Sequence, residues 1–349
     1  MSMMDEIIEN QVIGRIARAF EPPPCRLNGI HEADAEIIDL GSGSDKYLAV
    51  TTDALAEEVS GGLYDDPYLI GWMLATVNFS DLAAVGADPI GLLVALNLPR
   101  GQDEAFVGRL AEGISDACRE LRTFVLGGDT NEGKELLLSG SAFGLIPKGS
   151  LISRIGAQPG DRVYLTGPAG LGNVYAFLRL TRPGLRIPGL AYRPAARMEQ
   201  GRIIRRFGSS CMDTSDGVVH TVDTLMRLNQ RRFVLNDSWG ETVHPIALEV
   251  CRSQKLPPWL TLAGVHGEFE LCFTLNPQKE KEFVGEAAAA GWAPILIGEV
   301  ADGTGVYFKT AGGLVPLDSG LIRNLAAAVG SDQQGYIRQL LGYAQKVEI

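Results

Sequence analysis

The feature that most constrains this chain is an apolar run from Ile70 to Ala87. Pro67 suits the first turn of a helix, and Gly86 followed by Pro89 is typical of a helix end. The run predicts a buried helix, and it is shorter than the roughly 20 apolar residues that span a bilayer. Asp81 lies inside the run, where a lone buried carboxylate costs several kcal/mol or takes up a proton. We therefore expect a compensating group beside Asp81, unless its side chain is capped or half-exposed.

Strand-like and helical segments alternate along the rest of the chain. Expected strands lie at 35–40, 46–52, 90–98, 123–126, 136–146, 162–166, 295–299 and 305–308, and expected helices at 4–20, 103–121, 193–207, 217–229, 278–290 and 333–346. Residues 147–159 are rich in Gly, Pro and Ser, and 349 residues at roughly 150 per domain predict two domains. We expect an α/β (α+β) protein with domains at 1–150 and 151–349.

The charge and the cysteine content limit which classes of partner and which cellular compartment are expected. Lys and Arg total 31 against 42 for Asp and Glu, so the net charge of −11 has the wrong sign for a general nucleic-acid binder. The five cysteines lie far apart without a C-x-x-C pair, which favours neither a disulfide framework nor a zinc site. Asp5, Glu6 and Glu9 stand where a signal peptide would carry Lys or Arg. We expect a cytoplasmic protein that binds neither nucleic acid nor membrane.

Further aspartates stand beside Gly, Ser or Thr at expected element ends. Their segments are Thr51-Thr52-Asp53, Gly127-Gly128-Asp129-Thr130 and Asp213-Thr214-Ser215-Asp216-Gly217. Each segment alone is more typical of a turn or a helix N-cap than of a site. Asn78 shares a helix face with Asp81 at three-residue spacing, so that face offers two oxygen ligands.

If these carboxylates converged, they would require a cation. Two carboxylates about 4 Å apart repel by about 4 kcal/mol at an effective dielectric constant of about 20. A site built from Asp, Ser, Thr and Asn oxygens suits Mg²⁺ rather than Zn²⁺, and Mg²⁺ usually binds together with phosphate groups. The residue types therefore favour phosphoryl chemistry.

Motifs for other reactions are incomplete. Residues 128–134 fit the Walker pattern G-x-x-x-x-G-K, but Glu135 stands where Ser or Thr is required. Gly167, Gly170 and Gly172 lack the G-x-G-x-x-G spacing of a dinucleotide-binding loop. The four histidines lack H-E-x-x-H spacing, and no G-x-S-x-G elbow accompanies them. Hydrolase, zinc-enzyme and nicotinamide-binding hypotheses are therefore disfavoured.

The order of the motifs resembles the thiamine-monophosphate kinase family, a member of the aminoimidazole-ribonucleotide (AIR) synthase-like superfamily. The resemblance spans roughly residues 29 to 308. It rests on Thr51-Thr52-Asp53-Ala54-Leu55, the stretch Asn78 to Ala87, Gly127-Gly128-Asp129-Thr130, Arg154-Ile155-Gly156-Ala157, Pro159-Gly160-Asp161, Asp213-Thr214-Ser215-Asp216-Gly217, Gly267-Glu268-Phe269-Glu270-Leu271 and Ile297-Gly298-Glu299-Val300.

The resemblance implies an ATP-dependent phosphotransferase with a magnesium site. The implied magnesium-binding residues are Thr51, Thr52, Asp53, Asp81, Asp129, Asp213 and Asp216, and the implied ATP-binding residues are Gly128, Asp129, Arg154 and Ser215. Among these, Asp129 and Asp216 are expected to be essential for catalysis. The implied fold has an N-terminal sheet that pairs with the sheet of a second subunit, followed by a C-terminal α/β domain. The implied partners are a small-molecule phosphate acceptor and a second copy of the chain.

The departures from the family pattern concern the acceptor. The early G-D-D-A-A motif is absent, so Glu32 or Asp34 would have to replace its ligand. Ser60 stands where the family usually has His, Glu268 falls near an acidic substrate-contact position, and the C-terminal G-W/Y-D-H-F motif is missing. Phosphorylation of thiamine monophosphate is the leading hypothesis. The alternatives are ATP-dependent activation of an amide or carbonyl oxygen by a sibling enzyme, and a nucleotide-binding regulator without catalysis.

Overall fold

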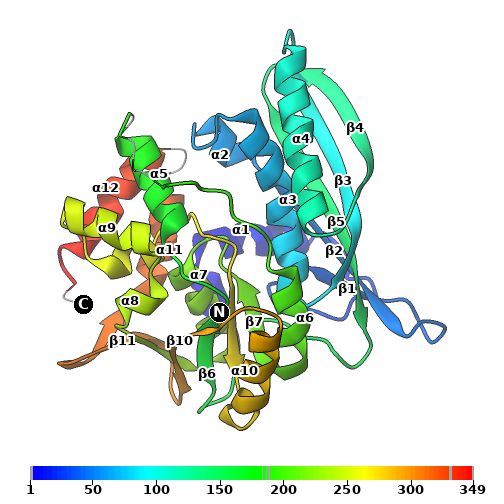
Figure 1. Cartoon of the computed structure of the whole chain (residues 1–349). Coiled ribbons are helices and arrows are strands. Elements are labelled where there is room, and N and C mark those ends of the chain that lie inside the picture. Colours follow the sequence, from blue (N-terminus) through cyan, green and yellow to red (C-terminus); the bar gives the residue numbers. More distant parts are fainter. Residues whose placement is uncertain (1–2, 183, 186, 188, 330–331, 348–349) are drawn as a thin grey trace.

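The computed structural model describes residues 3–182, 184–185, 187, 189–329 and 332–347. Within them the chain forms a five-stranded sheet of order β1-β2-β5-β3-β4, seen edge-on at the right of Figure 1. Its neighbours are antiparallel except β3 and β4, which run parallel. The strands are β1 (Glu36–Asp39), β2 (Lys46–Ala54), β3 (Asp88–Pro99), β4 (Val125–Gly133) and β5 (Leu137–Pro147).

A second sheet has seven strands in the order β12-β11-β8-β10-β6-β9-β7. Its neighbours are antiparallel except β8 and β11, which run parallel. The strands are β6 (Arg162–Leu165), β7 (Gly208–Asp213), β8 (Arg232–Asn236), β9 (Leu271–Leu275), β10 (Ile295–Ala301), β11 (Gly305–Thr310) and β12 (Gly313–Leu317).

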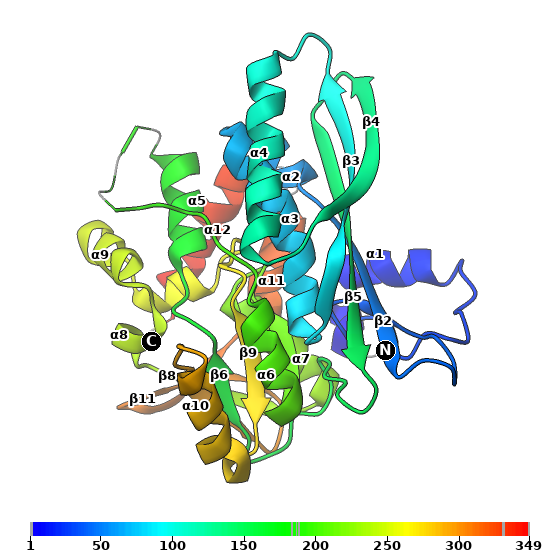
Figure 2. The same cartoon turned by 45° about the vertical axis from the view of Figure 1, so that its right-hand side comes forward.

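Helices pack against both sheets but leave one face of the five-stranded sheet uncovered, as the two views in Figures 1 and 2 show. The first half holds η1 (Met3–Glu6), α1 (Ile8–Ala17), α2 (Ala56–Ser60), α3 (Pro67–Ala84) and α4 (Glu104–Glu120). The second half holds α5 (Leu171–Thr181), α6 (Met198–Phe207), α7 (Val218–Asn229), α8 (Trp239–Thr242), α9 (Pro245–Gln254), η2 (Pro258–Leu262), η3 (Pro277–Lys279), α10 (Glu280–Ala289), α11 (Ser319–Val329) and α12 (Gln333–Ala344).

The apolar run forms α3, which is buried along nearly its whole length, as predicted. Asp66 caps its first turn by accepting a hydrogen bond from the Tyr68 amide, and Pro67 occupies the first helical position. Gly71 lets α4 approach closely, because a Cβ atom there would lie 2.0 Å from the Leu110 carbonyl oxygen. Such a helix is apolar on all sides because every side is covered.

Helix α3 packs between the two halves of the chain. It contacts β2 and β5 of the first sheet, and α6 and β7 of the second half. One continuous core therefore includes Phe79 of α3, Ile204 of α6 and Phe273 of β9. The second core lies around Trp259 and Phe308. The expected boundary between residues 150 and 151 falls between the two sheets and stays a prediction.

Several expected elements are confirmed and others need correction. The expected strands at 35–40 and 46–52 pair as the antiparallel β1 and β2. The strand expected at 123–126 is wrong in extent, because β4 continues through the glycine-rich segment to Gly133. The helix expected from residue 193 begins only at Met198. Residues 213–217 do connect β7 to α7, as expected.

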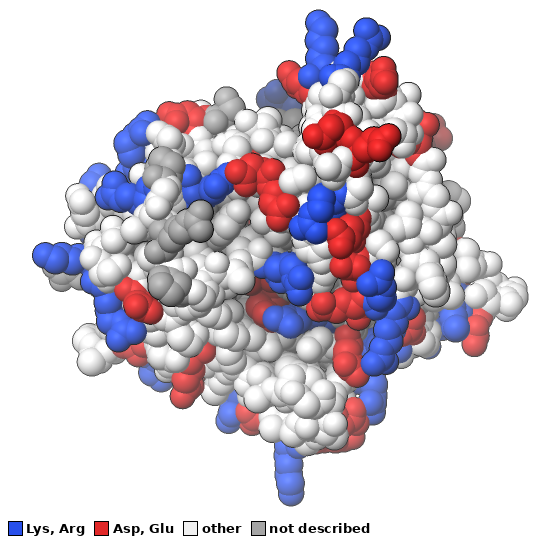
Figure 3. Space-filling view, turned by 45° about the horizontal axis from the view of Figure 1, so that its top comes forward, with Lys and Arg blue, Asp and Glu red and all other residues white. Residues whose placement is uncertain are grey.

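Two surface properties bear on the expected partners. In the part of the chain that the structure describes, no helix is long and apolar enough to cross a bilayer. On the face shown in Figure 3, acidic and basic side chains are interspersed rather than segregated into one extended basic region.

Candidate functional site

Three aspartates from distant parts of the chain meet where the two sheets approach each other. Asp34, Asp81 and Asp213 each offer a carboxylate oxygen, and these oxygens all lie within 4.8 Å of one another. Asp34 precedes β1, Asp81 lies in the last turn of α3, and Asp213 ends β7. We call these three residues the acidic triad. The predicted convergence of Asp81 and Asp213 is thus observed.

Hydroxyl groups hold two of the triad carboxylates in place. Thr51 Oγ1 donates to Asp81 Oδ2 at 2.5 Å. Ser80 Oγ donates to Asp213 Oδ2 at 2.6 Å, and Ser215 Oγ donates to Asp213 Oδ1 at 2.9 Å. Thr51 and Ser215, both predicted site residues, therefore lie beside the triad. Ser80 was not predicted, although it directly precedes Asp81 in the sequence.

The hydrogen bonds of Arg154 show which of Glu32 and Asp34 belongs to the site. Its Nη2 and Nε donate to the two carboxylate oxygens of Asp34 at 2.9 and 3.2 Å. Glu32 instead accepts a hydrogen bond from the Gly29 amide at 2.6 Å, so it points into its own turn. Asp34, and not Glu32, therefore belongs to the triad. Arg154 was predicted to contact ATP, and in this structure its guanidinium is engaged by Asp34.

The triad carries more negative charge than its surroundings neutralise. Burial raises the pKa of Asp213 to about 7, with a further contribution from the charge of Asp34. Burial also raises the pKa of Asp81 well above its ordinary value, and the charges of Asp213 and Asp34 add to this effect. Burial alone would lower the pKa of Arg154, but the Asp34 carboxylate raises it. Three carboxylates and one guanidinium leave two negative charges when all are ionised.

This donor set fits a hard divalent cation. Its atoms are carboxylate and hydroxyl oxygens, with no His or Cys in the triad. Two excess negative charges match one divalent cation, and oxygen ligands of this kind suit Mg²⁺ rather than Zn²⁺. The residues that would hold such an ion are the members of the triad.

Asp53 lies two residues after Thr51, on the face of β2 that is turned toward α3. Its charge contributes to the raised pKa of Asp81, of Glu58 and of Asp216, so it is within electrostatic reach of all three. Its own pKa is raised by burial. Asn78, expected as a ligand, is fully buried and instead accepts a hydrogen bond from the Asp53 amide at 3.0 Å. The ligand prediction for Asn78 is therefore wrong, and its role is to position Asp53.

A cavity of about 680 Å³ adjoins this region. Asp216 and Ser60, both predicted from sequence, line it. The other lining residues are Ile7, Glu9, Glu57, Glu58, Gly61, His220, Val265, His266, Arg323, Asn324, Ala326, Ala327, Gln333 and Tyr336. The surrounding protein desolvates Asp216 and raises its pKa to about 7. The volume is in the range of about 300–1,000 Å³ that is usual for small-molecule sites.

Asp129 lies far from the triad in its own chain. It is exposed on β4, an edge strand, and not at a strand end as predicted. Asp129 is in register with Ala95 of β3, and Ala95 is in register with Ser139 of β5. Ser139 in turn is in register with Ala54 of β2. Three strand spacings therefore separate Asp129 from β2, a distance of about 14 Å.

Asp129 also points away from α3. A Cβ atom at Gly140 would meet Asn78 of α3, so Gly140 and its partner Asp53 face that helix. Ser139 and the residues in register with it face the opposite side, because successive strand residues alternate. Thr52 lies on this opposite side, where its Oγ1 donates to the Gly140 carbonyl oxygen. Thr52 and Asp129 thus face away from the triad within one chain. Gly128 lies on the α3 side of the sheet but is kept from the triad by the three strand spacings.

Glu268 does not line the cavity. Its Oε1 accepts a hydrogen bond from the Gly172 amide at 2.7 Å, at the start of α5. Burial raises its pKa to about 8, although the amides of Gly172 and Gly170 partly oppose this. Glu268 thus anchors the start of α5, and its assignment to acceptor contact stays a prediction.

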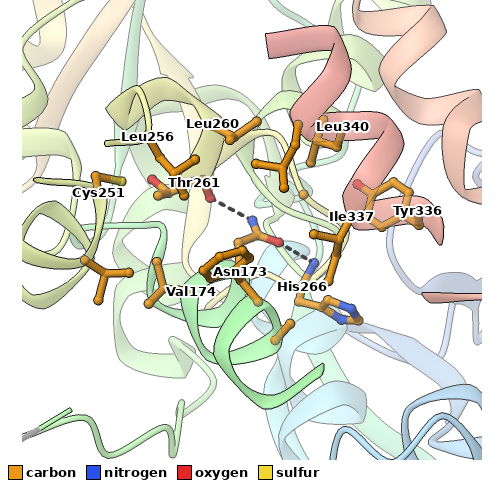
Figure 4. Close-up of a pocket in the computed structure, with 15 residues that line it drawn as sticks. Asn173, Val174, Cys251, Leu256, Leu260, Thr261, His266, Tyr336, Ile337 and Leu340 are labelled. Atoms are coloured by element: carbon orange, nitrogen blue, oxygen red, sulfur yellow. Dashed lines mark hydrogen bonds between the residues drawn. The ribbon is translucent and has the colours of Figure 1, made fainter. Parts of the chain in front are cut away.

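A smaller, apolar cavity of about 50 Å³ lies between α5, α9, η2 and α12 (Figure 4). Asn173 crosses it, donating to the Thr261 carbonyl oxygen and accepting from the His266 amide. His266 and Tyr336 line both this cavity and the larger one. The two residues therefore form the wall between an apolar space and a polar one.

Comparison with known proteins identifies the family. Residues 32–146 match the family described as AIR synthase related protein, N-terminal domain. A thiamine-monophosphate kinase from Pyrococcus horikoshii is 33% identical over 271 residues, which cover 76% of this chain and 82% of that protein. The chain belongs to the thiamine-monophosphate kinase family. The resemblance inferred from the order of the motifs is thereby confirmed.

Solved structures of this family share the fold. Thiamine-monophosphate kinase from Stenotrophomonas maltophilia is 27% identical, with a TM-score of 0.67 over 86% of this chain and 96% of that chain. AaThiL complexed with AMPPCP and TMP is 24% identical, with a TM-score of 0.73 over 88% of this chain and 95% of that chain. The expected AIR synthase-like α/β fold is therefore confirmed.

Proposed function

We propose that this chain is a magnesium-dependent kinase that transfers the γ-phosphoryl group of ATP to thiamine monophosphate, yielding thiamine diphosphate and ADP in thiamine biosynthesis. The observation that carries the proposal is the acidic triad of a thiamine-monophosphate kinase family member, with a cavity of small-molecule size beside it. The AaThiL structure, which contains AMPPCP and TMP, supports the choice of an ATP analogue and of this acceptor.

The triad is proposed to bind Mg²⁺, with Asp53 and Asp216 as further ligands toward the cavity. When bound, Mg²⁺ neutralises the phosphate oxygens of the nucleotide and aligns them for transfer. Thr51 and Ser215 orient the carboxylates by the hydrogen bonds described above. Arg154 holds Asp34 in place and adds positive charge beside the phosphates.

The reaction requires positioning rather than proton transfer. An oxygen of the acceptor phosphate forms a bond to the γ-phosphorus, while the bond from that phosphorus to the β-phosphate oxygen breaks and ADP leaves. A phosphate monoester is largely ionised near neutral pH, since its second pKa is about 6. No general base is therefore needed to activate it, which agrees with roles for aspartates as metal ligands.

We further propose that the enzyme is a homodimer joined through the face of the five-stranded sheet that α3 and α4 leave uncovered. Leu93 and Leu137 are 39% and 47% exposed on this sheet, and Phe124 beside β4 is 72% exposed. Grouped exposed apolar side chains are typical of protein interfaces. Asp129 faces the same side, so in such a dimer Gly128 and Asp129 would contribute from the interface.

The five cysteines support an assignment to the cytoplasm. All five are free thiols, and four of them are buried. A chain with this many unpaired cysteines suits a reducing compartment.

The function is tested by incubating the purified protein with Mg²⁺ and ATP. ADP formed only when thiamine monophosphate is present supports the kinase. ADP formed with an amide- or carbonyl-bearing acceptor instead would identify a sibling enzyme of the superfamily. Nucleotide binding without turnover with any acceptor would identify a regulator.

A second measurement tests the metal assignment. D216A is expected to bring turnover below detection without loss of the folded state, as judged by circular dichroism. Normal turnover by this variant would contradict the assigned role of Asp216.

A further inference from the structure

The large cavity contains a charged residue that none of the family motifs includes. Arg323, on α11, is the one Lys or Arg among the residues that line the cavity. The sequence lacks the family's C-terminal G-W/Y-D-H-F motif, and the C-terminal segment of this chain instead supplies α11 and α12 to the cavity wall. This wall of the cavity therefore comes from a part of the chain that lacks the family's C-terminal motif.

Buried partners hold the Arg323 guanidinium in one orientation. Its Nη1 donates to Thr224 Oγ1 at 2.9 Å and to Asp223 Oδ2 at 3.2 Å. The Asp223 carboxylate has no exposed surface and also accepts hydrogen bonds from Arg227 and Ser319. Neither Nε nor Nη2 of Arg323 makes a hydrogen bond to any residue that the structure describes. The Arg323 side chain is 8% exposed, and it lines the cavity.

Arg323 lies at the end of the cavity that holds Asp216. Its positive charge lowers the pKa of Asp216 against the larger effect of burial, so the two groups are within electrostatic reach. His220 lies there as well: its Nε2 is buried and makes no hydrogen bond to a described residue. An acceptor phosphate must lie at this end, because Asp216 is the proposed metal ligand nearest the cavity.

Other parts of the lining carry the opposite charge. Glu57 and Glu58 come from α2. Glu9, from α1, lies toward Asp216, because its charge adds to burial in raising the pKa of that carboxyl. With Asp216 they place four carboxylates around a cavity that has a single guanidinium. A purely anionic ligand would meet more repulsion than attraction here. A ligand with an anionic group at one end and a cationic body fits the distribution better.

We propose that Arg323 binds the phosphate of the acceptor, and that Glu57 and Glu58 face its positively charged body. The acceptor class is then a phosphate monoester with a cationic heterocycle, a description that thiamine monophosphate meets through its thiazolium ring. The inference rests on the proposed function and adds the residues that select the acceptor. Arg323 would supply the cationic contact on the acceptor side, where Ser60 replaces the family's usual His.

The test compares R323Q with the wild-type enzyme at saturating Mg²⁺ and ATP. Because hydrogen bonds from a guanidinium to an anion are worth about 1.5–3 kcal/mol, the KM for thiamine monophosphate should rise about 10- to 100-fold. The KM for ATP should stay within about twofold, because no nucleotide contact is removed. R323K, which keeps the charge but loses the planar fork, should recover part of the affinity.

Calorimetric measurements of binding affinity test the contacts to the two ends of the acceptor separately. Thiamine without a phosphate should bind equally to wild type and R323Q in the presence of Mg²⁺ and AMPPCP. E58Q should weaken the binding of thiamine and of thiamine monophosphate by similar factors. Equal losses of both ligands in R323Q would overturn the assignment of Arg323 to the phosphate.

R227Q is the matched control. Arg227 shares the Asp223 carboxylate with Arg323, but its Nη1 donates to Glu6 and to the Met3 carbonyl oxygen, and it does not line the cavity. R227Q therefore perturbs the same buried network without removing a cavity cation. A rise in KM as large in R227Q as in R323Q would show that Arg323 acts only through the network, which would contradict the proposal.

The outcomes of these experiments distinguish the inference about Arg323 from the proposed kinase function on which it rests. If wild type phosphorylates thiamine monophosphate and R323Q has an unchanged KM, the inference is wrong and the function stands. If wild type neither binds nor phosphorylates thiamine monophosphate, the function is wrong. Inorganic phosphate then serves as the probe: stabilisation of wild type but not of R323Q against heat supports the phosphate site, and equal stabilisation of both overturns it.

Discussion

Replacing Asp81 by Asn should stabilise the metal-free protein and abolish its response to Mg²⁺. Asp81 lies within 4.8 Å of both Asp34 and Asp213. At that distance and an effective dielectric constant of about 20, each pair of ionised carboxylates repels by about 3.5 kcal/mol. Arg154 offsets part of this repulsion, and proton uptake by Asp81 and Asp213 relieves more of it. A net gain of about 1–3 kcal/mol in the free energy of unfolding remains for D81N.

The assay is thermal unfolding at about pH 8, above the value of about 7 to which burial raises the pKa of Asp213. In chelator, D81N should melt at least about 2 °C above wild type. Millimolar Mg²⁺ should raise the Tm of wild type, because it binds the folded state, and should leave D81N nearly unchanged. Since raised carboxyl pKa values favour the protonated folded state, metal-free wild type should also gain stability as the pH falls from about 8 to about 6.

D302N is the matched control, because Asp302 occupies an exposed turn between β10 and β11. It should change neither the metal-free Tm nor the Mg²⁺ response. A lower Tm for D81N in chelator would refute the repulsion argument. A Mg²⁺ response as large in D81N as in wild type would refute the metal site.

Three other substitutions probe the surroundings of the site. N78A removes the acceptor for the Asp53 amide and a buried hydrogen bond to Leu74, so the free energy of unfolding measured in urea should fall by about 1–3 kcal/mol. E268Q removes a carboxyl group whose pKa is raised to about 8 from the ordinary 4.5. The free energy of unfolding of wild type should therefore fall as the pH rises from about 5 to about 8. In E268Q this fall should be smaller by at least about 1 kcal/mol. F124E places a charge on the uncovered sheet face. Sedimentation velocity should show a dimer for wild type, as proposed, and monomers for F124E.

For each of these three substitutions, a specific result would contradict the prediction, and two of them have a matched control variant. An unchanged urea midpoint for N78A would show that Asn78 does not support Asp53. E299Q, at an exposed position of β10, should keep the wild-type pH slope, and an E268Q slope equal to wild type would contradict the buried-acid argument. L314E, on the exposed β12 strand, should leave the dimer intact. Dimeric F124E, or monomeric wild type, would rule out the proposed interface.

The apolar run shows what local sequence can determine. Its composition and its Pro and Gly boundaries suffice to predict α3, because a segment without a polar face has to be covered on all sides. The same reasoning predicts that Asp81 needs compensation, since the cost of burying a carboxylate depends on its immediate surroundings. The interpretation of Asn78 failed because helix periodicity assigns a face and not a hydrogen-bond partner on another strand.

The segment around Asp129 shows where local patterns mislead. Gly and Thr beside an aspartate are typical of a turn, but here neighbouring β3 supplies backbone partners that keep the segment extended within β4. Strand pairing of this kind depends on residues about 35 positions earlier, and no pattern within the segment contains that information. The assignment of Asp129 to the magnesium site stays a prediction, because within one chain Asp129 lies away from the triad.

The sequence by itself determined the buried helix, the alternation of strands and helices, two of the three triad aspartates and the family to which the motifs point. Those properties follow from residue type and short-range spacing. Only the tertiary structure decided that Asp34 rather than Glu32 completes the triad, because the choice depends on Arg154, which lies 120 residues away along the chain. It also placed Arg323 in the wall of the large cavity, since that cavity exists only once α1, α2, α7, α11 and α12 have packed around it.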